Sequence, residues 1–135
     1  DFSVFESLEK YELNSYVNHV SYLAHDLVIK EQMKSHVLLL MINQTPNAKG
    51  IVTGKVFEYM ASGRPTLIIG PTDGDVSKIV IKCNAGITCA YDDVVNIKQE
   101  ILQLFYKKKE YKASINSYSR ESLTEKLVDI LNSLV

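Results

Sequence analysis

The sequence predicts an α/β fold in which a parallel sheet carries helices on both of its faces. Short apolar runs of strand length alternate with longer segments whose apolar residues recur at helical spacing, and polar turn residues separate them. This alternation is typical of open parallel sheets. We therefore expect one three-layer αβα, Rossmann-like domain over residues 1–135, an ordinary length for a single domain.

Four segments have the character of strands. Residues 37–42 (VLLLMI) are continuously apolar, as expected for a strand that is covered on both faces. Residues 66–69 (TLII) form a second run of this kind. Residues 16–20 and 86–90 are shorter runs that we also predict to be strands.

Six segments have apolar residues three or four positions apart, which predicts amphipathic helices. Their expected ranges are 2–13, 23–33, 54–62, 75–82, 94–106 and 119–134. Thr53, Asp75 and Ser119 stand where N-caps are expected. Gly63 follows the third helix, at the position where a left-handed residue ends many helices.

The composition argues against several classes of function. The chain has 15 basic and 16 acidic residues and a net charge of −1, whereas nonspecific nucleic-acid binding needs a basic surface. The longest apolar run, residues 37–42, is too short to span a membrane. The three histidines lack metal-ligand spacing, so no protein-held metal is expected. Cys83 and Cys89 are too few for a disulfide framework and are expected to be small buried residues in a reducing compartment.

Two loops are predicted to rim one cleft. Residues 43–53 and 70–74 each follow a predicted strand, and ligands of open parallel sheets bind at the carboxyl ends of the strands. The first loop runs into a helix through the sequence GIVTGKVFEYMASGRP, residues 50–65. A helix N-terminus offers free N–H groups and a positive dipole end to a phosphate. Glu58, one turn further on, offers a carboxylate to sugar hydroxyls, so this pairing suggests a nucleotide.

The run GKVFEYMASGRPTLIIGP, residues 54–71, resembles the C-terminal donor-binding domain of GT-B glycosyltransferases of the retaining, family-four type. Residues 21–25 (SYLAH) are similar to the Tyr-x-x-His turn of that family. Residues 35–40 (SHVLLL) resemble its Ala-Asp-Val-Leu-Leu-Leu strand, and residues 84–86 (NAG) its Thr-Gly-Ala-Gly turn. The resemblance covers about residues 16–135. It implies a hexosyltransferase that uses a UDP- or GDP-linked sugar as substrate in bacterial polysaccharide synthesis, without a further cofactor.

The resemblance also assigns roles to individual residues. The family carries two acids that are separated by seven residues; the second matches Glu58, which is expected to bind the donor ribose. The first falls on Gly50, where this sequence departs from the pattern. The donor diphosphate is expected at Thr53, Gly54, Lys55 and Lys49. The expected contacts to the donor sugar are Gly50, Ile51 and Asp73.

The resemblance leaves parts of the family's machinery unmatched. The N-terminal acceptor domain, which would bind the acceptor glycan or lipid-linked sugar, and the first two strands of the donor domain have no counterpart here. The chain alone is therefore expected to be inactive and to contain no catalytic residue. Two alternatives stay open: a non-catalytic Rossmann-like interaction or regulatory module, and a sugar-nucleotide epimerase domain.

Simpler readings of the motif residues also stay open. Glu58 could be a solvated acid that pairs with Lys55, and Gly50 and Gly54 could be turn and cap glycines. The basic residues of 107–112 leave room for a cytoplasmic protein that is peripheral at the inner face of the cell membrane. An open edge on the strand at residues 37–42 predicts a homodimer.

Overall fold

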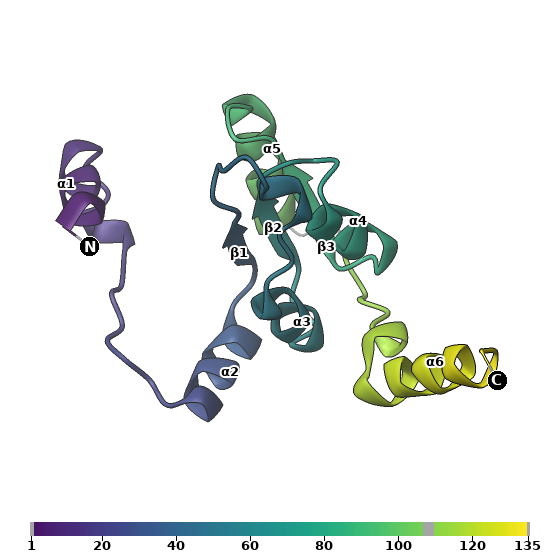
Figure 1. Cartoon of the computed structure of the whole chain (residues 1–135). Coiled ribbons are helices and arrows are strands. Elements are labelled where there is room, and N and C mark those ends of the chain that lie inside the picture. The colour runs from purple at the N-terminus through teal and green to yellow at the C-terminus, as the bar shows by residue number, and fades with distance from the viewer. Residues whose placement is uncertain (1, 107–109, 135) are drawn as a thin grey trace.

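The computed structural model describes residues 2–106 and 110–134, so part of the basic stretch 107–112 lies outside the described residues. Three parallel strands, β1 (Leu38–Met41), β2 (Thr66–Ile69) and β3 (Gly86–Cys89), form one sheet in the order β1-β2-β3 (Figure 1). Helices flank this sheet, which confirms the predicted α/β, Rossmann-like fold class.

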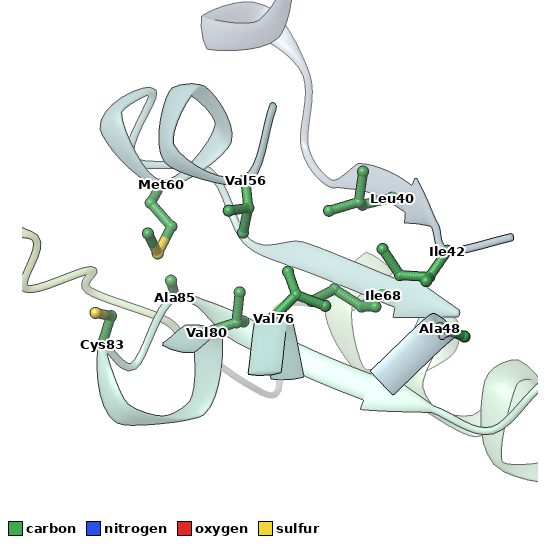
Figure 2. Packing of buried hydrophobic residues seen from close by; sticks show 10 residues of the cluster. All are labelled: Leu40, Ile42, Ala48, Val56, Met60, Ile68, Val76, Val80, Cys83 and Ala85. Carbon is green, nitrogen blue, oxygen red and sulfur yellow. The ribbon is translucent and has the colours of Figure 1, made fainter. Parts of the chain in front are cut away.

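Two crossover helices cover one face of the sheet. α3 (Gly54–Ala61) joins β1 to β2, and α4 (Asp75–Lys82) joins β2 to β3. Since strand order follows chain order, two right-handed crossovers place both helices on the same side. Between them and the sheet lies the main core, drawn in Figure 2, which consists of Leu40, Ile42, Ala48, Val56, Met60, Ile68, Val76, Val80, Cys83 and Ala85.

α5 (Val94–Phe105) packs on the opposite face and forms the third layer. Its Leu104 is buried, and Asn96 Nδ2 donates to Cys89 Sγ at 3.6 Å. This cover does not extend over β1, where Leu39 and Met41 are 52% and 64% exposed. The prediction that residues 37–42 are covered on both faces is therefore wrong, because no described helix lies over that part of the second face.

Three further helices lie around this body. α2 (His25–Lys34) leads into β1, whereas α1 (Phe2–Lys10) and α6 (Arg120–Asn132) lie apart from the sheet in Figure 1. None of the residues of α6 is buried. Short 3₁₀ turns occur at η1 (Asn14–Tyr16), η2 (Ala48–Gly50) and η3 (Asn116–Tyr118). No helix in the described part of the chain is long and apolar enough to cross a membrane.

Some local predictions are confirmed. Gly63 follows α3 with φ +69°, the left-handed conformation expected there. Ser119 caps α6, since its hydroxyl accepts a hydrogen bond from Ser122 N at 3.1 Å. Both features depend only on neighbouring residues, which is why the sequence pattern indicates them.

Other local predictions are wrong. Residues 16–20 are not a strand: η1 ends at Tyr16, and residues 17–20 pair with no strand although Val17 is extended. Val17 and Val20 are exposed, and a strand cannot form without a neighbour to pair with. Gly74, not Asp75, is the N-cap of α4. Thr53 stands at the N-cap of α3, but its side chain makes no capping bond.

Candidate functional site

A cleft of about 560 Å³ opens at the carboxyl ends of the three strands. Residues 44–50 line it after β1, residues 70–73 after β2, and residues 90–91 after β3. The first two segments belong to the loops that were predicted to rim one cleft, and the structure brings them together. The third segment was missed, although it too directly follows a predicted strand and so belongs at the same edge of the sheet.

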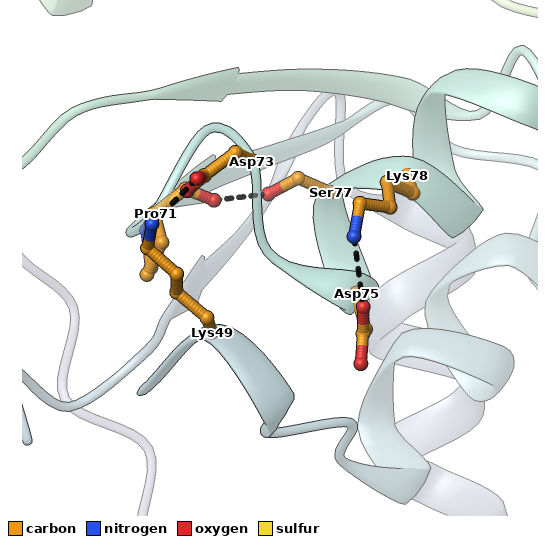
Figure 3. A network of polar contacts seen from close by, with 6 residues as sticks. All are labelled: Lys49, Pro71, Asp73, Asp75, Ser77 and Lys78. Atoms are coloured by element: carbon orange, nitrogen blue, oxygen red, sulfur yellow. Dashed lines mark hydrogen bonds and ion pairs between the residues drawn. The ribbon is translucent and has the colours of Figure 1, made fainter. Parts of the chain in front are cut away.

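An ion pair joins the first two loops across this cleft. Lys49 Nζ lies 2.6 Å from Asp73 Oδ2, and both side chains line the cleft (Figure 3). The hydrogen bond from Lys49 holds the pKa of the Asp73 carboxyl below its usual range, with desolvation acting in the opposite direction. Asp73 is therefore ionised at neutral pH and neutralises the one predicted cation that reaches the cleft.

The loop that carries Asp73 is fixed from its other side. Ser77, a fully buried residue of α4, donates its hydroxyl hydrogen to Pro71 O at 2.6 Å (Figure 3). Gly74 N donates to the same carbonyl at 3.1 Å. Space at Gly74 is limited, since a Cβ there would lie 3.1 Å from Pro71 O and 3.3 Å from Lys49 O. This rim of the cleft is consequently a well-held turn.

Tyr91 closes the cleft on the side of β3. Its hydroxyl donates to Asn43 O at 3.4 Å, which links the end of β3 to the loop after β1. The ring is half-buried and contributes to the lining beside Ala90. An aromatic ring with a polar tip at such an edge is suited to contact a planar or sugar-like ligand.

The entrance of α3 lies just beyond the cleft in the chain and has unsatisfied donors. Val56 N donates to Thr53 O at 3.2 Å, but within the described part of the chain the amides of Gly54 and Lys55 donate to no acceptor. The Thr53 hydroxyl is buried and has no partner there either. Free amides at a helix N-terminus attract anions.

The glycines at this entrance are not explained by backbone geometry. Neither Gly50 nor Gly54 has a left-handed φ, and a Cβ on either would meet nothing within 4 Å. A turn or a cap therefore does not require glycine at these two positions. The open space leaves the backbone accessible to a ligand.

Glu58 is exposed on α3, one turn after the entrance. The ion pairs between described residues include Lys34–Glu31, Lys49–Asp73 and Lys78–Asp75 but no pair of Lys55 with Glu58, so the simpler reading of Glu58 as the partner of Lys55 is not supported. Its carboxylate is available to a ligand.

The structure thus divides the predicted residues into three groups. Lys49, Gly50 and Asp73 line the cleft. Thr53, Gly54, Lys55 and Glu58 lie at and after the entrance of α3, outside the cleft lining. Ile51 packs against the core instead of lining the cleft.

Both cysteines are buried, as predicted, and neither forms a disulfide in the described part of the chain. Burial raises the pKa of the Cys83 thiol, and the charge of Lys82 opposes this only in part, so the thiol stays protonated and unreactive. Among the described residues, no group of three His, Cys, Asp or Glu side chains is arranged to hold a metal ion.

We compared the chain with protein-family models, with curated proteins and with solved structures, and none of the three comparisons gives a match.

Proposed function

We propose that this chain is the donor-binding domain of a retaining glycosyltransferase of the hexosyltransferase type, and that it binds a UDP- or GDP-linked sugar. One observation carries the proposal: the cleft at the carboxyl ends of the strands contains the cation of Lys49, and the loop that carries Lys49 runs on into a helix entrance with free amides. A cation and a helix N-terminus together form a phosphate site.

The diphosphate is the group that this arrangement serves. The amides of Gly54 and Lys55, the positive end of the α3 dipole and the Lys49 ammonium would hold its oxygens. In glycosyl transfer the diphosphate leaves with added negative charge. Preorganised donors at that position lower the barrier by stabilising this charge.

The ribose and the donor sugar occupy the two sides of the diphosphate in this proposal. Glu58, exposed and without an ion-pair partner in the described chain, accepts hydrogen bonds from ribose hydroxyls. Gly50 and Asp73 line the cleft where the sugar would lie. Ile51 is less suited to this role, because it faces the core.

The acceptor belongs to another domain in this proposal. A glycan or lipid-linked sugar would be presented from an N-terminal domain, at a cytoplasmic site peripheral to the inner face of the cell membrane. The chain by itself binds the donor and does not catalyse transfer.

One observation favours a second candidate, a non-catalytic Rossmann-like module. Gly50 replaces an acid that the resembling family uses for the donor sugar. A module of this kind would keep the fold and the cleft without holding a nucleotide.

Calorimetry of the chain with UDP and with GDP separates the two candidates. The donor domain must bind one of them, and Glu58→Ala must weaken that binding about ten-fold, the loss of a hydrogen bond to a charged group. Glu125→Ala, which removes an exposed acid on α6, is the matched control and must leave the affinity unchanged. Absence of binding to both nucleotides would favour the non-catalytic module.

A further inference from the structure

The Lys49–Asp73 ion pair affects the binding of an anion in the cleft. We propose that Asp73 competes with phosphate for the Lys49 ammonium. Its carboxylate forms an ion pair with Lys49 in the proposed phosphate site, and an incoming phosphate must displace that carboxylate. That the ligand is a nucleotide rests on the proposed function. The displacement of the Asp73 carboxylate applies to any phosphate that enters the cleft. Asp73 thereby sets the affinity of the cleft for anions, a different role from contact with a donor sugar.

The geometry makes the exchange possible. Lys49 and Asp73 come from different loops, their charged atoms lie 2.6 Å apart, and both side chains line the same cleft. The two side chains are 71% and 64% exposed, so water screens the pair and it is weak. A phosphate carries more charge and more acceptor oxygens than a carboxylate, so it is the stronger partner for an ammonium.

The backbone does not have to move for this exchange. The turn that carries Asp73 is held by the bonds from Ser77 and Gly74 to Pro71 O, and Gly50 N donates to Asn47 O at 3.0 Å in the turn that carries Lys49. Displacement of Asp73 therefore needs only a side-chain rotation, which for an exposed residue is fast. Lys49 remains in the cleft after its partner has left.

A nearby ion pair supplies the control. Lys78 Nζ lies 3.1 Å from Asp75 Oδ1, and these side chains are 67% and 55% exposed, close to the values for Lys49 and Asp73. Figure 3 shows the two pairs together. Neither Asp75 nor Lys78 lines the cleft. Asp73→Asn and Asp75→Asn each remove one negative charge, but only the first frees a cation in the cleft.

The test is calorimetry of the full chain with UDP, GDP and inorganic pyrophosphate at low salt. Asp73→Asn must raise the affinity about three- to five-fold, the range expected from release of an exposed ion pair. Asp75→Asn must leave it unchanged. In a Lys49→Gln background, Asp73→Asn must have no effect, because no cation is left to free. Circular dichroism of each variant establishes that it is folded.

Three results would overturn the inference: unchanged or weaker binding by the Asp73→Asn variant, an equal gain from Asp75→Asn, or a gain that persists without Lys49. The last two would show a general effect of charge. If neither nucleotide binds to any variant, the proposed function fails, and the pyrophosphate titrations alone decide the role of Asp73. An unchanged pyrophosphate affinity in Asp73→Asn would then refute it.

Discussion

Two glycines of this chain differ in the space that a side chain would have. A Cβ on Gly86 would lie 1.9 Å from Thr66 O, closer than any real contact, whereas a Cβ on Gly54 would meet nothing within 4 Å. Gly86 is therefore required by the fold. The fold does not require glycine at position 54, so the chain's own packing does not explain this residue. We infer that close approach of the ligand explains it.

Gly54→Ala tests this inference at a single atom. Alanine at the first position of a helix loses less entropy on folding than glycine, so we expect the free energy of unfolding to rise by about 0.5–1 kcal/mol. We also expect UDP or GDP to bind about ten-fold more weakly, because the added methyl group stands between the phosphate and the amide. Thermal unfolding and calorimetry measure the two effects. A variant that gains stability and keeps its affinity would show that no ligand approaches this backbone.

The pKa of Asp73 reports on its ion pair. Because the folded-state pKa is lowered, mainly by the Lys49 hydrogen bond, the pair contributes to folding above the carboxyl's unfolded pKa. This contribution is lost as the pH falls through the lowered folded pKa. We predict that carboxyl NMR gives Asp73 a titration midpoint below its ordinary value, and that Lys49→Met returns the midpoint towards that value. An unchanged midpoint in Lys49→Met would mean that the pair does not form in solution.

At the scale of single elements, the sequence predicts what is encoded locally and misses what depends on distant partners. The three strands of the sheet, the left-handed Gly63 and the Ser119 cap follow from short apolar runs and from cap chemistry. The strand predicted at residues 16–20 fails because its apolar residues find no neighbour. Pairing is a tertiary property, and a short apolar run does not specify it.

Pairing of β2 with β3 depends on Gly86. Thr66 N donates to Ala85 O, and Thr66 lies opposite Gly86 in the register, so a side chain at Gly86 would push the two strands apart. We predict that Gly86→Ala lowers the free energy of unfolding by about 3 kcal/mol or more, the upper range for overpacking. Denaturant unfolding measures this, with Gly50→Ala as the control at an open position. Equal stabilities of the two variants would contradict the close approach.

The position of the cleft can be predicted from the sequence, but the side-chain contacts within it cannot. Its position follows from topology, because the loops after parallel strands meet at one edge. That Lys49 would be held by Asp73, 24 positions away, does not follow from any local pattern. The part played by Tyr91 is missed for the same reason, since its partner Asn43 belongs to another loop.

At the scale of the whole molecule, the described structure leaves apolar surface uncovered. β1 is an edge strand, and its outward-facing Leu39 and Met41 are exposed. The strand has no proline or charge, the devices that natural edges use against pairing. We propose that a second copy pairs with this edge, with the two β1 strands antiparallel about a two-fold axis.

Light scattering at increasing concentration tests this dimer. We predict a dimer at high concentration, and a monomer when Leu39→Lys places a charge on the outward face of the strand. Leu127→Lys, on the exposed apolar side of α6, is the control and must leave the dimer intact. A monomer at every concentration would rule out the dimer, and a loss of the dimer by Leu127→Lys alone would assign the contact to α6.

The cleft and the entrance of α3 are proposed to bind the diphosphate of a nucleotide. Amide NMR of the chain during titration with UDP and with GDP tests it most directly. We predict saturable shifts at Lys49, Gly50, Gly54, Lys55 and Asp73. A second cavity, of about 290 Å³ and lined by His36 and Arg64, is an internal control that must stay unchanged. No shifts with either nucleotide, or shifts confined to that second cavity, would contradict the claim.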